Sequence, residues 1–196
     1  MADPVDVLDY WLGEVGPQGW YVGGAVLDAD ILNRFGDLWQ AAMAGGLDHW
    51  AEGTVGSLAF LILVDQFPRN MFRGEARAFA SDGLALAAAR RAVVQGWDMG
   101  APEPERQFFY MPFEHSEDLA DQALAVQLMA ERLPGHPDQL LHARAHQAVI
   151  ARFGRFPTRN AALGRDDTAQ EAEFLATGGY AAVVRSLQGQ SHASGT

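Results

Sequence analysis

The sequence predicts an all-α protein with a single domain, and three observations predict this class. Apolar residues recur near the 3.6-residue period of a helix, no segment alternates as a half-buried strand would, and helix caps or glycine stops mark most segment ends. The chain has 196 residues, 48% of them hydrophobic, which is enough for one substantial core. We therefore expect one helical domain over residues 1–188 and a disordered tail over residues 189–196.

Eight helices are expected, each with a recognisable start or stop. In chain order they span residues 4–14, 29–44, 54–67, 75–95, 116–133, 137–153, 168–175 and 180–187. Asp3 and Pro4 suit the N-cap and first position of the first helix. Asp28 is expected to cap the second helix, which a pair of glycines at 45 and 46 ends.

The third predicted helix is apolar nearly all round over residues 58–64, as suits a helix buried on most sides. A central strand is the rival interpretation, but the flanking segments have the period of helices and offer no strand partner. Pro68 is expected to stop this helix, because proline lacks an N–H to donate and disfavours helical ψ at Phe67.

The alanine-rich segment 75–95 favours a helix that Gly96 closes. The next segment, residues 97–115, contains three prolines and the aromatic residues Phe108, Phe109, Tyr110 and Phe113, and predicts a long loop. Loops of this length in compact domains are usually functional or tightly packed. Ser116 then suits the N-cap of the helix that runs to residue 133.

The last three helices are defined mainly by their ends. Pro137 opens a helix that Gly154 closes. Thr168 and Glu171 have the spacing of a capping box. A short final helix over residues 180–187 precedes the predicted tail.

Composition excludes several functional classes. A net charge of −11 argues against binding nucleic acid through a general basic surface, and no apolar run approaches the roughly 20 residues of a membrane-spanning helix. The absence of cysteine excludes disulfides and thiolate chemistry, and the chain's first residues lack the basic start of an export signal. We expect a cytoplasmic protein that binds neither nucleic acid nor membrane.

Two segments of the chain resemble each other. Residues 65–70 read Asp-Gln-Phe-Pro-Arg-Asn, and residues 154–160 read Gly-Arg-Phe-Pro-Thr-Arg-Asn. If Phe-Pro ends a helix in both places, two similar turns bring Arg and Asn side chains together to hold an anionic group. The candidate ligand-binding residues of these segments are Asp65, Arg69, Asn70, Arg73, Arg155, Arg159, Asn160 and Arg165.

The alternative is that these arginines pair with carboxylates of the same chain. The carboxylates considered are Asp65, Glu114, Glu117 and Asp118, against six arginines in residues 65–74 and 152–165, so one-to-one pairing leaves two arginines over. Both interpretations stay open, because clusters of charge occur at structural as well as functional sites.

His115 lies between acidic neighbours in the stretch Glu114-His115-Ser116-Glu117. A histidine beside carboxylates is suited to acid–base catalysis, so Glu114 and His115 are candidate catalytic residues and Glu117 a candidate ligand contact. The alternative is a plain helix start at Ser116, with the acids placed by the helix dipole.

His142 and His146 are four residues apart on one predicted helix. This spacing is able to present two imidazoles to a metal, but a typical site needs three or four ligands, so we predict no metal. His146 also lies on the apolar stripe of its helix, and we include it among the candidate ligand contacts.

Taken together, four motifs resemble an uncharacterised, mostly bacterial family, domain of unknown function 924 (DUF924). They are Val7–Trp11, Asp65–Gly74, Tyr110–Asp118 and Arg152–Asn160, and the resemblance reaches to about residue 175. It implies an all-helical superhelix similar to tetratricopeptide-repeat proteins, a TPR-like array, although the chain shows no clear 34-residue period. The family usually has His where Thr158 stands here, and it implies no activity.

Two functions follow as hypotheses. The first is a pocket lined by Arg, Asn, Glu and His that binds a small anionic molecule, with or without catalysis. The second is a TPR-like scaffold that binds a peptide or protein, and it rests on analogy of fold alone. The sequence leaves any cofactor, the ligand, the reaction and the oligomeric state undefined.

Overall fold

The computed structural model describes residues 3–193, and their side chains as far as residue 190. The described residues form helices and turns without any strand, which confirms the all-α class. The chain divides into two compact units, an N-terminal unit over Met1–Pro112 and a C-terminal unit over Phe113–Thr196, and each is described by itself.

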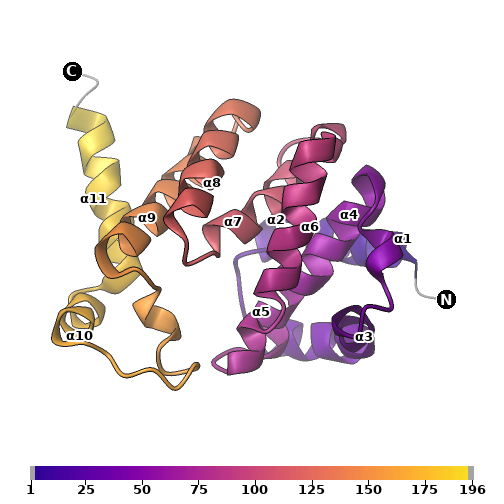
Figure 1. Cartoon of the computed structure of the whole chain (residues 1–196), viewed down its shortest axis with the longest axis horizontal. Helices are drawn as coiled ribbons and strands as arrows, with labels where there is room; N and C mark the ends of the chain where they lie inside the picture. Colours follow the sequence, from indigo (N-terminus) through magenta and orange to yellow (C-terminus); the bar gives the residue numbers. More distant parts are fainter. Residues whose placement is uncertain (1–2, 194–196) are drawn as a thin grey trace. The chain divides into compact units, whose positions relative to one another are not determined.

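The N-terminal unit is built from six α-helices, two of which continue directly into π-helical turns (Figure 1). The helices are α1 (Pro4–Leu8), α2 (Gly16–Gly19), α3 (Ala25–Met43), α4 (Gly53–Leu61), α5 (Phe67–Met71) and α6 (Asp82–Gln95). The π-helical turns are Asp9–Val15 and Ile62–Gln66, and 3-10 turns span Asp48–Trp50, Ala76–Phe79, Trp97–Gly100 and Glu105–Phe109. Within this unit α3 packs against α5, and α4 packs against α1 and α6.

The first predicted cap is confirmed and the second is wrong. The carboxylate of Asp3 accepts the N–H of Val5 at 2.9 Å, as an N-cap does. Helix α3 instead begins at Ala25, with Gly24 in the N-cap position. Asp28 therefore lies in the first helical turn, where its carboxylate is available to distant side chains.

The helix over α4 and α5 does not stop at Pro68 as predicted, because a π-helical turn accommodates the proline. Phe67 keeps helical angles, φ −59° and ψ −39°, and its N–H donates to the carbonyl of Ile62, five residues earlier. The carbonyl four residues before Pro68, that of Val64, accepts the hydroxyl of Ser81 at 2.5 Å.

Ser81 also explains why the predicted helix 75–95 is interrupted. Its side chain is fully buried, donates to Val64 and accepts the indole N–H of Trp39 at 3.1 Å. These bonds hold Ser81 between the turn Ala76–Phe79 and the start of α6 at Asp82. A serine that binds other segments in this way competes with a continuous helix.

Aromatic rings form the core of the N-terminal unit. Phe67 packs against Phe35 at 4.8 Å between ring centroids and against Trp11 at 5.4 Å. Trp11 also packs against Phe108 at 6.4 Å. The predicted loop 97–115 thus contributes buried aromatic residues, and it contains the 3-10 turns Trp97–Gly100 and Glu105–Phe109.

The C-terminal unit consists of helices around α9, and the boundary between the units falls in the short helix α7 (Met111–Glu114). The longer helices are α8 (Leu119–Arg132), α9 (Pro137–Phe153), α10 (Ala169–Ala176) and α11 (Gly179–Ala193), with a 3-10 turn over Pro157–Arg159. α9 packs against both α8 and α11, which lie on either side of it in Figure 1.

The ends of these helices confirm two predictions and correct a third. Gly154 ends α9 with φ of 68°, and Thr168 and Glu171 form a capping box at α10. The N-cap of α8, however, is Asp118 and not Ser116, because the carboxylate of Asp118 accepts the N–H groups of Ala120 and Asp121.

The final helix is longer than the sequence predicted. α11 runs from Gly179 to Ala193, whereas the expected helix covered residues 180–187. Residues 194–196 of the predicted tail lie outside the described residues, so a tail there stays a prediction, as does a single domain over residues 1–188.

A substitution at Gly56 tests the packing of α4. A Cβ added there would collide with the carbonyl oxygen of Trp50, so we expect Gly56→Ala to reduce the free energy of unfolding by about 1–3 kcal/mol. Gly83→Ala is the matched control, since a Cβ at Gly83 in α6 would meet open space and the change should stabilise by about 0.5–1 kcal/mol. Urea unfolding of both variants measures the difference, and an equally stable Gly56→Ala protein would contradict the packing.

Candidate functional site

A pocket of about 270 Å³ opens beside helix α9 in the C-terminal unit. Its lining residues are His146, Val149, Phe156, Pro157, Thr158, Phe174 and Tyr180. Four of them, Val149, Phe156, Phe174 and Tyr180, also belong to or pack against the apolar core of this unit. The pocket is therefore a gap in the apolar core. Its titratable groups are the imidazole of His146 and the hydroxyl of Tyr180.

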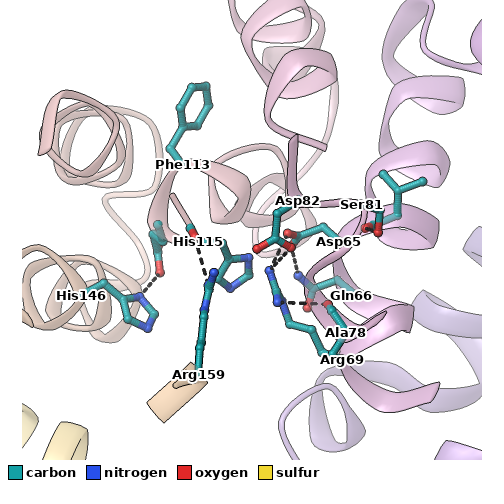
Figure 2. Close-up of polar contacts among 12 residues, drawn as sticks. Asp65, Gln66, Arg69, Ala78, Ser81, Asp82, Phe113, His115, His146 and Arg159 are labelled. Atoms are coloured by element: carbon teal, nitrogen blue, oxygen red, sulfur yellow. Dashed lines mark hydrogen bonds and ion pairs between the residues drawn. The ribbon is translucent and has the colours of Figure 1, made fainter. Parts of the chain in front are cut away.

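His146 is oriented by a buried carboxylate. Nδ1 of His146 donates to Oε2 of Glu114 at 3.0 Å, and Glu114 is only 3% exposed (Figure 2). Since an ionised carboxylate only accepts hydrogen bonds, this contact fixes the proton on Nδ1. Nε2 is then the nitrogen left to meet a ligand, and no described residue bonds to it.

Tyr180 forms a wall of the pocket through its ring. The ring stacks on that of His146 at 4.8 Å, and its hydroxyl lies 2.7 Å from Nδ1 of His142. Burial, and then the negative charge of Glu114, raise the pKa of Tyr180, so the hydroxyl stays protonated. Burial lowers the pKa of His142, which favours its neutral form.

Arg159 and His115, two predicted site residues, meet near the same pocket. The guanidinium of Arg159 donates to the backbone carbonyl of His115 at 3.0 Å, as Figure 2 shows, and lies 4.5 Å from the ring centroid of Phe156. The imidazole of His115 lies 6.2 Å from that of His146 between centroids. Glu114, His115, His146 and Arg159 thus lie close together, and their function as a site stays a prediction.

Glu117 and Arg165 hold the loop that carries Phe156. The two side chains form a bidentate ion pair at 2.8 and 3.0 Å, Glu117 accepts the N–H of Phe156, and Arg165 donates to its carbonyl. Partial burial disfavours the charge of Glu117, but the bonds from Arg165 and Phe156 outweigh it and lower its pKa. Their role is to position one wall of the pocket.

Arg155 and Asn160 also serve the structure of the unit. Arg155 donates to both oxygens of Glu171 at 2.6 and 2.7 Å, and this bond lowers the pKa of Glu171 strongly. Asn160 is buried and donates to the carboxylate of Asp167 at 2.7 Å. Neither side chain lines the pocket.

The predicted site residues of the N-terminal unit are likewise bound to carboxylates. Figure 2 shows Arg69 between Asp65 and Asp82, with N–O distances of 3.2 and 2.9 Å. Arg73 pairs bidentately with Asp28, which also accepts the amide of Asn70. The bond from Arg73 lowers the pKa of Asp28, so both groups are held in their charged forms.

The two Phe-Pro segments are not equivalent turns as expected. Phe67-Pro68 continues a helix, whereas Phe156-Pro157 follows the end of α9 and begins a 3-10 turn. The segments belong to separate units, so a joint anion site stays a prediction. Three of the carboxylates that pair with the arginines, Asp28, Asp82 and Glu171, were missing from the count made on the sequence.

Sequence reasoning also missed the pocket walls. Phe156 was seen only as part of a repeated motif, and Tyr180 only as the start of a helix. The four-residue spacing of His142 and His146 was the signal available, since both contact Tyr180. Within residues 3–193, no group of three or more His, Cys, Asp or Glu side chains is arranged to hold a metal ion.

The fold and the pocket define a class of all-helical protein in which a carboxylate–histidine pair borders an aromatic cavity. The family model of bacterial proteins of unknown function, DUF924, matches residues 7–179, and the chain belongs to this family. A solved structure of a protein of unknown function from Agrobacterium tumefaciens is similar, with 42% identity, a TM-score of 0.84, and coverage of 89% of this chain and 97% of the other. No curated protein matches the chain. None of the helices in the described part of the chain is long and apolar enough to cross a membrane.

The ion pair of Glu117 predicts a pH dependence. Because the folded state lowers the pKa of Glu117, its stabilisation is present above about pH 4.5, the ordinary value, and is lost as the pH falls through the folded value. We expect Glu117→Gln to lower the free energy of unfolding by about 1–2 kcal/mol at pH 7, allowing for partial exposure, and by much less at pH 3.

Urea unfolding at both pH values measures this difference. Glu173→Gln, a change at an exposed glutamate of α10, is the matched control and should leave stability nearly unaltered. A Glu117→Gln deficit of the same size at pH 3 and pH 7 would contradict an ionic role.

Proposed function

We propose that the C-terminal unit binds a small anionic molecule in the 270 Å³ pocket, with His146 as its main polar contact. The observation that carries the proposal is the bond from His146 to the buried Glu114 at 3.0 Å. A buried carboxylate that bonds to one nitrogen of an imidazole fixes the orientation of the ring. The other ring nitrogen is then already oriented to bind a partner.

The pocket has the make-up of small-molecule sites in general. Such sites are concave and mostly apolar, with a few polar groups that fix orientation. Here Val149, Pro157 and the rings supply the apolar surface, and His146 and Thr158 supply the polar groups. The volume suits a ligand of about one ring and its substituent.

Charge next to the pocket favours an anionic group. The pairs Glu117–Arg165 and Glu171–Arg155 neutralise themselves. The guanidinium of Arg159 lies over the ring of Phe156, 4.5 Å from the ring centroid. A protonated His146 beside Glu114 is able to donate Nε2–H to an anion, and a neutral one to accept a proton at Nε2 from the protonated acid form of the ligand.

Proton transfer follows from the same geometry, so the site is also a candidate for catalysis. His146 is able to take a proton at Nε2 while Glu114 stabilises the resulting imidazolium through Nδ1. The predicted catalytic pair was Glu114 and His115; the contacts support Glu114 with His146, and His115 remains a neighbour of that pair.

We also propose that the protein is cytoplasmic, because its sequence contains no cysteine. We expect neither nucleic acid nor a membrane as a partner. The alternative, a TPR-like scaffold for a peptide or protein, stays a prediction. A pocket of this size, walled by rings, suits a small molecule better than a chain.

The proposal predicts that a small carboxylate or phosphate raises the melting temperature of the protein and that His146→Gln abolishes the shift. A ligand at 100 times its dissociation constant stabilises the folded state by about 2.7 kcal/mol. The measurement is a thermal-shift series with acetate, benzoate, succinate and inorganic phosphate on the whole chain.

His49→Gln is the matched control, because His49 is exposed in the N-terminal unit. It should keep every shift of the parent protein. If no compound shifts the parent, or if His146→Gln keeps the shift, the pocket is not the binding site.

A further inference from the structure

Two hollows of about 580 and 590 Å³ lie on the surface of the N-terminal unit. The first is lined by the π-helical turn Asp9–Val15, the loop after α2 and the start of α3, and the second by the same turn and the end of α1. Glu14 borders both hollows, and we call the pair the N-terminal groove. The groove is thus built on a π-helical turn, an irregularity that is frequent at functional sites.

Aliphatic side chains line the first hollow and are open to solvent. Val22 is 66% exposed and Val26 is 88% exposed, and the partly buried Val15 and Leu27 lie beside them in the lining. Small-molecule sites bury most of their ligand, which side chains as exposed as these are unable to do. The groove therefore suits a segment of another chain that covers the surface from outside.

The charged side chains of the lining carry an excess of negative charge. Arg34 donates to Glu14 and to Asp30, each at 3.0 Å, so these three side chains together have one net negative charge. Asp9 lines the second hollow, is exposed, and forms no side-chain bond to any described residue. It adds a second negative charge that no arginine offsets.

A further cation lies beside the lining and is paired as well. Arg73 lies against Gly23, where an added Cβ would collide with its guanidinium, and it bonds to both oxygens of Asp28. Asp28 also lies in the first turn of α3 and offsets the partial positive charge of that helix end. Four carboxylates against two guanidinium groups leave the groove with two net negative charges.

The surrounding chain has the same sign of charge. Residues 1–64 contain nine acidic residues and one arginine, and no lysine. A field of one sign attracts a partner of the opposite sign and repels a like surface. A second copy of the groove is therefore a poor partner, because its charge is also negative.

Apolar lining and negative charge agree on one kind of occupant. We propose that the N-terminal groove binds a basic amphipathic segment of another protein, in which aliphatic side chains lie next to Lys or Arg. The aliphatic side chains cover Val22 and Val26, and the cations meet Glu14 and Asp9. This site belongs to the N-terminal unit and does not rest on the function proposed for the pocket beside α9.

The test measures binding of three capped, dye-labelled peptides of equal length to the whole chain by fluorescence anisotropy. The first peptide combines lysine with leucine, the second replaces leucine by serine, and the third replaces lysine by glutamate. We expect the lysine–leucine peptide to bind about tenfold or more tightly than the other two, because only it matches both the apolar lining and the charge. Its affinity should fall as salt is added, since exposed charges are screened.

Two variants with matched controls locate the site. Glu14→Gln removes a charge that borders both hollows, and Val26→Ser removes an exposed apolar side chain. Each should weaken the lysine–leucine peptide about threefold or more. Asp37→Asn and Val94→Ser make the same kinds of change at exposed positions of α3 and α6 outside the groove, and they should leave the affinity unaltered.

Several outcomes would overturn the proposal. If the lysine–serine peptide binds as tightly as the lysine–leucine peptide, or if Asp37→Asn weakens binding as much as Glu14→Gln, the attraction is one of diffuse charge. If no peptide binds, or if the chain is a dimer that Val26→Ser dissociates, the groove has no such occupant. His146→Gln should bind the lysine–leucine peptide like the parent protein, so the result is independent of the pocket beside α9.

Discussion

Buried carboxylates are the constraint on which the rest of this structure depends. Five acidic side chains are at most 3% exposed, namely Asp65, Asp98, Glu114, Asp121 and Glu171. A carboxylate removed from water needs a hydrogen-bond donor or a positive charge beside it. Arg69 meets this need for Asp65, Arg155 for Glu171 and His146 for Glu114. Many of the positively charged side chains therefore pair with buried carboxylates and hold helices and turns in place.

The sequence predicted the fold class and several helix ends well, because those features depend on neighbours a few residues away. The capping box at Thr168 and the glycine stop at Gly154 are examples. Pro68 was misjudged because a π-helical turn allows the helix to continue, and within that turn the carbonyl of Val64 accepts the hydroxyl of Ser81. That hydrogen bond joins residues 17 positions apart, so no local sequence pattern predicts it.

The candidate site was predicted in part for the same reason. Glu114 and His146 were both selected, but the bond between them spans 32 positions and only the folded chain shows it. The pairing of the arginines stayed open for the sequence, because several of their partners are also far away along the chain. Arg73 and Asp28, for example, are 45 residues apart. The positions of charged residues in a sequence indicate where charged side chains are concentrated. They do not indicate which of these side chains form pairs.

Position 158 shows how such a pocket is able to change over evolutionary time. Thr158 lines the pocket, is exposed, and makes no hydrogen bond to any described residue. Its replacement therefore costs the fold little, whereas the histidine, the buried glutamate and the ring-bearing loop are tied to the core. A substitution at this one rim position therefore alters the lining of the pocket and leaves the helices that surround it in place.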